Sequence, residues 1–192
     1  MARNASVTRP TKELSARDLM LASPHPGPFD RKGWVFEMKY DGFRVLAIKQ
    51  GQLVRLLSRR NRDMALSFPE IVASMQDLPT IALDGELVVL NDLGIPQFER
   101  LRWRSLMRQH KEIVHASSNE PAAIFAFDLL SLNGKDMRRR PLLERKEVLR
   151  EEIAEAPRIK YASHIGERGE ALYAQVDKLE VEGIVAKRAD SP

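Results

Sequence analysis

The alternation of apolar and polar residues along the chain predicts short β-strands separated by turn signals. The expected strands cover Trp34–Tyr40, Phe43–Lys49, Gln52–Ser58, Ile81–Leu90, Ala122–Leu130 and the segment IVAK at 184–187. Asp41-Gly42 separates the first two strands and Gln50-Gly51 the next two, so each pair is expected to form a β-hairpin. Asn133-Gly134 is a further turn signal after the strand that begins at 122.

Helix signals occupy the stretches between these strands. Ser67 is expected to cap a helix that has Pro69 in its first turn and Glu70 three residues after the cap. Gln97–Met107 is also expected to be helical. By contrast, residues 108–120 are polar and are expected to be exposed.

Two later helices are predicted from apolar residues that recur with a period of about 3.6 residues. The first begins at Pro141, and the second covers Glu167–Glu180. Their apolar faces contain Leu142, Leu149 and Ile153 in the first helix, and Leu172, Val176 and Leu179 in the second. Hairpin strands combined with segregated helices predict an α+β fold, in which mostly antiparallel β-sheets are flanked by helices.

The composition is that of a soluble globular protein, with 43% hydrophobic and 30% charged residues in 192 positions. This length suffices for one well-cored domain with room for a smaller lobe. The absence of cysteine excludes disulfides and thiolate metal sites. No apolar run reaches the roughly 18 residues that span a bilayer, and the N-terminus lacks the apolar core of a secretory signal. We therefore expect a cytoplasmic protein with no membrane partner.

The polar N-terminal residues differ in character from the rest of the chain. Residues 1–20 are polar and contain Pro10, so we expect a loosely ordered lead-in before a single domain over residues 21–192. Ser23–Asp30 has three prolines and one glycine and is expected to be a loop.

Arginines gather in three short clusters, although the net charge is only +4 and the sequence pI is about 9.5. The clusters are Arg59, Arg60 and Arg62; Arg100, Arg102 and Arg104; and Arg138–Arg140. Such clusters suit phosphate backbones and predict a salt-sensitive, sequence-independent affinity for nucleic acid. The alternative is a solvated basic face balanced by acidic neighbours, which the stretch 144–155 supplies.

Lys39 lies in the octapeptide EMKYDGFR, at the end of an apolar strand-like run and between Glu37 and Asp41. A lysine in such a place can lose solvation and act as a nucleophilic amine at neutral pH. Taken alone, the pattern also fits an ordinary edge-strand lysine of a β-hairpin. Four further charged segments follow in order beside strand-like stretches: SRRNRD at 58–63, LDGELVV at 83–89, FAFDLL at 125–130 and EGIVAKR at 182–188.

Together these segments resemble motifs I, Ia, III, IIIa and IV of the covalent nucleotidyltransferases, which include ATP-dependent DNA ligases, RNA ligases and capping enzymes. The strongest resemblance is to the ligase module of bacterial end-joining DNA ligases, and it runs from about residue 21 to residue 192. It implies the ATP-grasp-like nucleotidyltransferase fold of DNA ligases and mRNA-capping enzymes. It also implies that a lysine attacks the α-phosphate of ATP, expels pyrophosphate and carries AMP for DNA strand joining in repair.

The resemblance assigns roles to several residues around the nucleotide. Lys39 is the expected nucleophile, and Glu37 is expected to help to read the adenine amino edge. Phe127 matches the aromatic residue that stacks on adenine, although Phe125 lies on the same strand face and leaves the register open. Lys187 is expected to approach phosphate oxygens; the alternative is an exposed strand lysine.

The match to the family's motifs is weaker at two arginines. Arg44 is expected to reach the nucleotide sugar or the nick, and an ordinary surface arginine is an equal alternative. Arg59 matches the motif Ia arginine that binds a phosphate. Asn61 stands where the family usually has glycine. Because asparagine tolerates a positive φ better than most residues, the turn is expected to survive.

Glu86 and Glu182 are the expected metal-binding carboxylates of motifs III and IV. An NTP substrate needs a hard divalent cation, and Mg²⁺ (or Mn²⁺) accepts one or two carboxylates while keeping waters. One of the two glutamates can instead serve the ribose hydroxyls. Asp84 and Asp128 are expected to make local supporting contacts.

Family members continue beyond motif IV into motif V, a K-x-K pair at the α-phosphate, and then into an OB-fold, and neither lies within these 192 residues. We therefore expect impaired activity from residues 1–192 alone. The expected partners are nicked or broken duplex DNA, a C-terminal OB-fold segment and end-joining proteins, in the bacterial cytoplasm or nucleoid. Two alternatives remain open: a non-catalytic module that binds nucleotide or nucleic acid, and an RNA ligase or capping-type nucleotidyltransferase.

Overall fold

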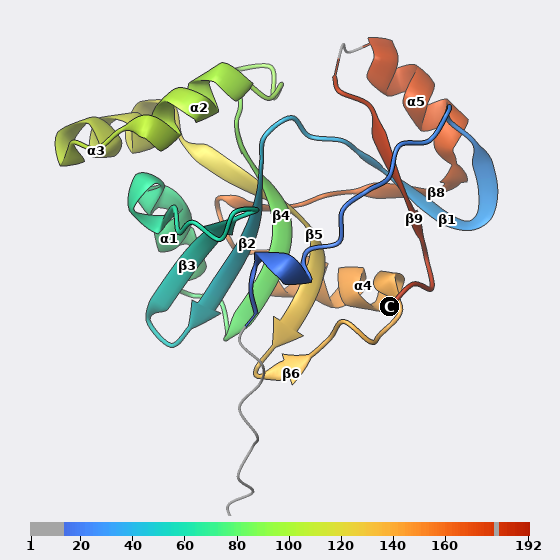
Figure 1. Cartoon of the computed structure of the whole chain (residues 1–192), viewed down its shortest axis with the longest axis horizontal. Helices are drawn as coiled ribbons and strands as arrows, with labels where there is room; N and C mark the ends of the chain where they lie inside the picture. Colours follow the sequence, from blue (N-terminus) through green and yellow to red (C-terminus); the bar gives the residue numbers. More distant parts are fainter. Residues whose placement is uncertain (1–13, 179–180) are drawn as a thin grey trace, which may run out of the picture.

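Two β-sheets form the frame of the protein in the computed structural model, which describes residues 14–178 and 181–192 (Figure 1). The strands of the larger sheet are β2 (Phe43–Gln50), β3 (Leu53–Ser58), β4 (Ile81–Val89), β5 (Ala122–Leu132), β6 (Lys135–Asp136) and β7 (Ile159–Tyr161). Their order is β3-β2-β4-β5-β6, and β7 also pairs with β5. The smaller sheet has the order β8-β1-β9, with β1 (Asp30–Met38), β8 (His164–Arg168) and β9 (Ile184–Arg188). Every pairing of named strands in the described ranges is antiparallel except the parallel pair β5–β7.

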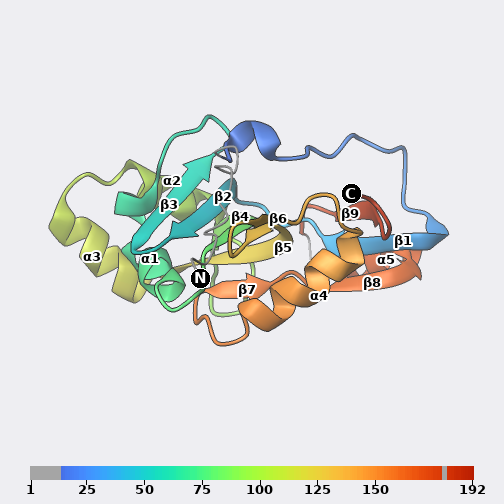
Figure 2. The same ribbon diagram turned by 90° about the horizontal axis from the view of Figure 1, so that it is seen from below.

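Five α-helices are described: α1 (Pro69–Met75), α2 (Phe98–Leu106), α3 (His110–Asn119), α4 (Leu142–Glu152) and α5 (Gly169–Lys178). Helices α1, α2 and α3 gather at one end of the larger sheet, and α5 lies beside the smaller sheet (Figure 1). Figure 2 shows α4 running alongside β5 and β7. Two short 3₁₀ turns cover Ala16–Asp18 and Ala65–Ser67. The α+β class with mostly antiparallel sheets is confirmed.

The main hydrophobic core lies between one face of the larger sheet and its covering helices. Side chains of β2, β4 and β5 pack there against α1 and α4, as Leu83, Ile71 and Leu149 illustrate, each with no exposed surface. A smaller cluster around Leu46 and Leu130 includes the buried Leu19, which the 3₁₀ turn at 16–18 precedes. The helices therefore cover one face of the larger sheet. The part of the opposite face that the smaller cluster leaves uncovered is available for a site.

The first predicted hairpin is wrong, whereas the second, β2–β3, is confirmed. β1 pairs with β8 and β9, and β2 pairs with β3 and β4, so Asp41-Gly42 connects two different sheets. A Cβ on Gly42 would collide with the carbonyl oxygen of Leu87 and come within 2.9 Å of Val88 Cγ1. The glycine is thus needed because the chain passes directly over β4.

The predicted start of the helix near residue 67 is corrected. Ser67 belongs to a 3₁₀ turn, and α1 is capped by Phe68 without a side-chain hydrogen bond, although Pro69 does open the helix. Glu70 accepts from Ala122 N at 2.8 Å instead of reaching back to a cap. The stretch 108–120 is mostly exposed, as expected, but it also contains α3, because Ile113 and Ala116, three residues apart, supply a short buried stripe.

The remaining helices follow the predicted periodicity. α4 buries Leu142 and Leu149, with Ile153 buried just beyond its end. α5 buries Val176, while Leu179 lies outside the described residues. Within the predicted lead-in, residues 14–20 include a 3₁₀ turn with a capping box at Ser15, and residues 1–13 lie outside the described part.

Candidate active site

Lys39 and Glu182 come together where β1 ends and β9 begins. The backbone N–H of Lys39 donates to Gly183 O at 2.9 Å, which continues the β1–β9 ladder. The Lys39 ammonium forms an ion pair with the Glu182 carboxylate, and each side chain is 43% exposed. The fold therefore brings motifs I and IV into contact. At this exposure the Lys39 side chain is partly open to solvent and is held by its acidic partner.

Neighbouring strands of the larger sheet contribute a row of side chains beneath this pair. Arg44 on β2 is paired in register with Glu86 on β4, and Glu86 is paired with Phe125 on β5. Directly opposed residues point to the same face of a sheet, so all three face the Lys39 side. The charges of Lys39 and Asp41 both act on Glu86, so the turn after Lys39 lies close to this carboxylate.

Burial raises the pKa of Glu86 to about 7, because loss of solvation outweighs the stabilising charge of Arg44. The Arg44 guanidinium donates to both Asp84 oxygens, at 2.5 and 2.7 Å, and to Met20 O at 3.0 Å. Asp84 thus makes a local supporting contact, as expected from the sequence. Arg44 is held in place and is not projecting freely towards a sugar.

Glu37 is the most enclosed acidic residue of the site, with 2% of its surface exposed. Lys187 on β9 donates to Glu37 Oε2 at 2.6 Å. Lys146 on α4 lies 2.7 Å from Oε1, in an ion pair that lacks the geometry of a directed hydrogen bond. One carboxylate oxygen therefore has its charge balanced but still lacks a directed donor.

Lys146 is a functional candidate that the sequence reasoning missed. Its side chain is fully buried and donates to Ala162 O at 3.0 Å and to Phe127 O at 3.4 Å. Burial lowers the pKa of Lys146, and the charge of Glu37 opposes that shift. The signal was present in the helical periodicity, because Lys146 falls four residues after Leu142 and three before Leu149, on the buried face of α4.

The two candidate aromatic residues have different surroundings. Phe127 is 9% exposed, and the charged ends of Arg44 and Lys187 lie 4.3 and 4.2 Å from its ring centroid. Phe125 stacks on Tyr40 with ring centroids 4.0 Å apart. Lys187 contacts both Phe127 and Glu37, so Phe127 is the ring that belongs to the Glu37 cluster, here defined as Glu37, Phe127, Lys146 and Lys187.

Arg59 lies in the turn after β3, and no described contact joins it to Lys39 or to the Glu37 cluster. The turn itself forms as expected, because Asn61 adopts φ 61° and its N–H donates to Ser58 O at 2.7 Å.

The second arginine cluster is not a free phosphate-binding surface, contrary to the expectation from the sequence. Arg104 is 1% exposed and forms an ion pair with Glu70, and its Nη1 also donates to Glu120 O at 2.9 Å. Arg100 and Arg102 have acidic partners at 3.4 and 3.6 Å. In the third cluster, Arg138 bridges Asp18 and Asp136 at 2.6 and 2.7 Å. Ion pairs with acidic residues thus neutralise much of the positive charge of these two arginine clusters.

The family model of the ATP-dependent DNA ligase domain matches residues 20–192. The chain belongs to this family. Among curated relatives, a DNA ligase of Thermococcus fumicolans is 35% identical over 163 residues, covering 81% of this chain and 29% of the relative. The multifunctional non-homologous end joining protein LigD of Mycobacterium bovis is 32% identical over 160 residues, covering 82% of this chain and 19% of the relative. The chain thus spans well under half of these relatives.

Solved structures show the same fold. The ligase domain of M. tuberculosis LigD is 30% identical with a TM-score of 0.68, covering 85% of this chain and 51% of that structure. A mycobacterial DNA ligase D complexed with ATP and MES is 30% identical with a TM-score of 0.66, covering 82% and 49%. The protein therefore has the nucleotidyltransferase fold of ATP-dependent DNA ligases. Within the described ranges no helix is both long and apolar enough to cross a membrane.

Proposed function

We propose that this ATP-dependent DNA ligase adenylation domain transfers AMP from ATP to Lys39, for use in joining breaks in duplex DNA. The observation that carries the proposal is the meeting of Lys39 with Glu182 above Glu86, beside the Glu37 cluster. An amine nucleophile, paired carboxylates and an enclosed carboxylate beside an aromatic ring are the groups that adenylation requires. Membership of the DNA ligase family favours DNA over RNA as the nucleic acid, and relatives named for end joining support a role in repair.

The reaction forms one bond and breaks another. Lys39 Nζ bonds to the α-phosphorus while the bond from that phosphorus to the bridging oxygen of pyrophosphate breaks. Lys39 must be a neutral amine to attack, and its half-exposed position gives the ammonium proton a route to solvent. Lys187, through its contact with Glu37, is placed to orient the nucleotide, and Arg44 offsets negative charge on the face of the sheet that carries Glu86.

In the Glu37 cluster, the enclosed carboxylate suits the amino edge of adenine. Oε1 is enclosed and faces Lys146, so an exocyclic amino group would meet the carboxylate at Oε2, where Lys187 now donates. Phe127 provides a flat face beside it, and Lys146 fixes the carboxylate from behind. A guanine would present a carbonyl oxygen to the same carboxylate, which repels it.

Glu86 and Glu182 fit a hard divalent cation, Mg²⁺ or Mn²⁺, because both are carboxylates on the Lys39 side of the site. The burial that raises the pKa of Glu86 is a cost that a bound cation offsets. Such a cation supplies charge neutralisation to the phosphate groups when bound. Lys39 and Glu182 already neutralise each other, so cation binding and release of the amine are expected to be coupled.

The test is covalent labelling. Residues 1–192 are incubated with α-labelled ATP or GTP and Mg²⁺, and the label that survives denaturation is mapped by peptide mass spectrometry. We expect AMP on Lys39, at a slow rate because the family's K-x-K pair lies outside these residues. Lys39→Arg is expected to lose the label because a guanidinium stays protonated, while Lys135→Arg keeps it. A label on another lysine would overturn the assignment.

A further inference from the structure

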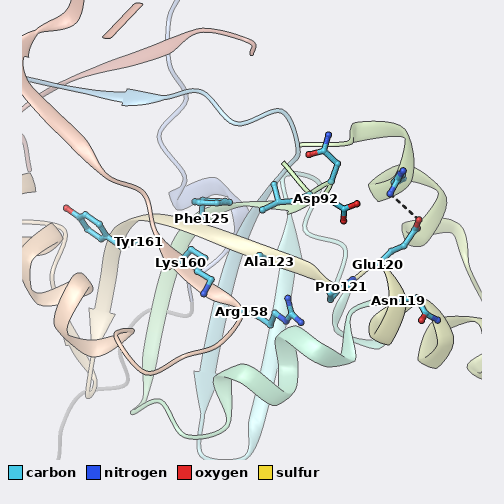
Figure 3. Close-up of a pocket in the computed structure, with 12 residues that line it drawn as sticks. Asp92, Asn119, Glu120, Pro121, Ala123, Phe125, Arg158, Lys160 and Tyr161 are labelled. Carbon is cyan, nitrogen blue, oxygen red and sulfur yellow. Dashed lines mark ion pairs between the residues drawn. The ribbon is translucent and has the colours of Figure 1, made fainter. Parts of the chain in front are cut away.

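A cavity of about 620 Å³ lies immediately beside the Lys39 site (Figure 3). The row formed by Arg44, Glu86 and Phe125 continues in register to Lys160 on β7, so Lys160 lies on the same face of the sheet. Phe125 and Lys160 both line the cavity, and the Tyr40 ring covers Phe125 from the Lys39 side. The cavity is therefore the lateral continuation of the active-site face.

The positive charge of this cavity is concentrated at one end. Lys160 is exposed and Arg158 is half-buried, and neither side chain has a hydrogen bond or ion pair among residues 14–178 and 181–192. At the opposite rim, Arg100 is neutralised by Glu120 at 3.4 Å, the ion pair drawn at Glu120 in Figure 3, and Asp92 adds negative charge. An anion is thus attracted to the Arg158–Lys160 end.

One aromatic side chain, Phe125, lies on the same face of the sheet as Lys160 and lines the same cavity (Figure 3). Tyr161 borders the cavity, but its ring packs on the core side, where Lys146 Nζ lies 4.6 Å from the ring centroid. Two unpaired cations spaced along one segment of the chain fit successive phosphates of a nucleic-acid strand. By contrast, a small anion would leave most of a cavity of about 620 Å³ empty.

We propose that the Arg158–Lys160 end binds the phosphodiester backbone of the DNA strand that enters the Lys39 site. This inference rests on the proposed function, because it takes DNA as the polymer that meets Lys39. β4 and β7 are separated only by β5, so Lys160 lies about 10 Å from the Glu86 backbone at the usual strand spacing. About three nucleotides span this distance at 3.4 Å of helix axis per phosphate in one strand. A strand that runs from Lys39 across Glu86 towards β7 would therefore bring one of its phosphates to Lys160.

These residues differ from the arginine clusters that the sequence emphasised. Arg104 is buried, and Arg100, Arg102 and Arg138 are paired, whereas Arg158 and Lys160 are isolated in the sequence and free in the fold. Parallel pairing of β7 with β5 creates this site, and residues 125 and 160 are too far apart in sequence for local pattern to reveal it.

The experiment measures binding of a fluorescent nicked duplex with a 5′-phosphate to residues 1–192, by anisotropy over a series of salt concentrations. Lys160→Glu is compared with Lys160→Arg and with Lys135→Glu, an exposed strand lysine on β6 at the far end of β5. We expect Lys160→Glu to weaken binding and to reduce the slope of log K against log salt by about 1, the value for one lost phosphate contact. Lys160→Arg is expected to keep the wild-type slope, and Lys135→Glu should change it much less.

Equal slopes for Lys160→Glu and Lys135→Glu, or no DNA binding by the wild type, would overturn the proposal. Covalent labelling by ATP in the same preparations separates the two possible phosphate sources. If Lys160→Glu raises the ATP concentration needed to label Lys39 and leaves DNA affinity unchanged, the site holds the ATP polyphosphate and the inference is wrong. If the wild type binds DNA through Lys160 but never labels Lys39, the proposed function fails and this site stands.

Discussion

At the scale of single residues, the buried Lys146 connects three parts of the site that lie far apart in sequence. It contacts the Glu37 carboxylate on β1, the Phe127 carbonyl on β5 and the Ala162 carbonyl between β7 and β8. Removing one partner of a buried ion pair is costly because the other charge stays desolvated. Lys146 is thus a positioning residue for Glu37 and not a group that reacts.

Lys146→Met is expected to lower the free energy of unfolding by about 3 kcal/mol, at the low end for a buried pair because Lys187 still contacts Glu37. Urea denaturation measures this change. Arg102→Met is the control, because its ion pair with Glu99 is exposed and exposed pairs contribute about 0–1 kcal/mol. Compared with Lys146→Met, Lys146→Arg should recover part of the lost free energy of unfolding. It should also recover part of the labelling of Lys39 by ATP. Equal losses in Lys146→Met and Arg102→Met would contradict the assignment.

The raised pKa of Glu86 predicts a pH dependence of stability. Its pKa rises from 4.5 to about 7 in the fold, so between these values the folded protein holds a proton that the unfolded chain has lost. The stabilising contribution is fully present below pH 4.5 and is lost as the pH rises through about 7. Glu86→Gln should flatten this part of the profile of unfolding free energy against pH. Glu144→Gln, at an exposed position on α4, is the control, and an unchanged profile in Glu86→Gln would refute the prediction.

At the scale of elements, the passage of the chain from β1 to β2 places Gly42, three residues after Lys39, directly over β4. Gly42→Ala is expected to destabilise the protein by about 1–3 kcal/mol, as overpacking does, because the new Cβ meets the Leu87 carbonyl. It should also slow labelling of Lys39, since the turn that carries the lysine must move. Gly166→Ala on β8 is the matched control, because nothing lies within 4 Å of a Cβ there. Similar melting temperatures and labelling rates for both variants would show that the close passage is unimportant.

The sequence predicted most elements, because strand alternation is a local feature. The residues that the ordered motifs selected, apart from Arg59, are brought together by the fold, and their roles remain predictions. The sequence pattern mispaired β1 with β2, since an Asp-Gly turn fits both a hairpin and a crossing between sheets. Only the distant partners β8 and β9 decide between these alternatives. The sequence pattern also assigned Arg104 to the surface. In the fold it is buried in an ion pair with Glu70, which lies 34 positions away in the sequence. Side chains whose environment comes from distant segments are therefore the ones that local pattern misplaces.

At the scale of the whole molecule, the proposed nucleotide site draws on both sheets. Glu37 and Lys187 come from the smaller sheet, whereas Glu86 and Phe127 come from the larger one. A ligand that contacts both sheets stabilises their relative arrangement and so the folded chain as a whole. The base-reading carboxylate then determines which nucleotide can have this effect.

ATP with Mg²⁺ is expected to raise the melting temperature of residues 1–192, and GTP is expected to raise it much less. At a ligand concentration 100 times Kd the gain is about 2.7 kcal/mol, or about 5–10 °C for a chain of this size. Differential scanning fluorimetry measures both shifts, with Lys39→Arg used to prevent covalent labelling. Glu37→Gln should narrow the difference between ATP and GTP, because an amide can donate to the guanine carbonyl oxygen as well as accept from an amino group. Equal shifts for ATP and GTP in the chain with Glu37 intact would show that another group reads the base.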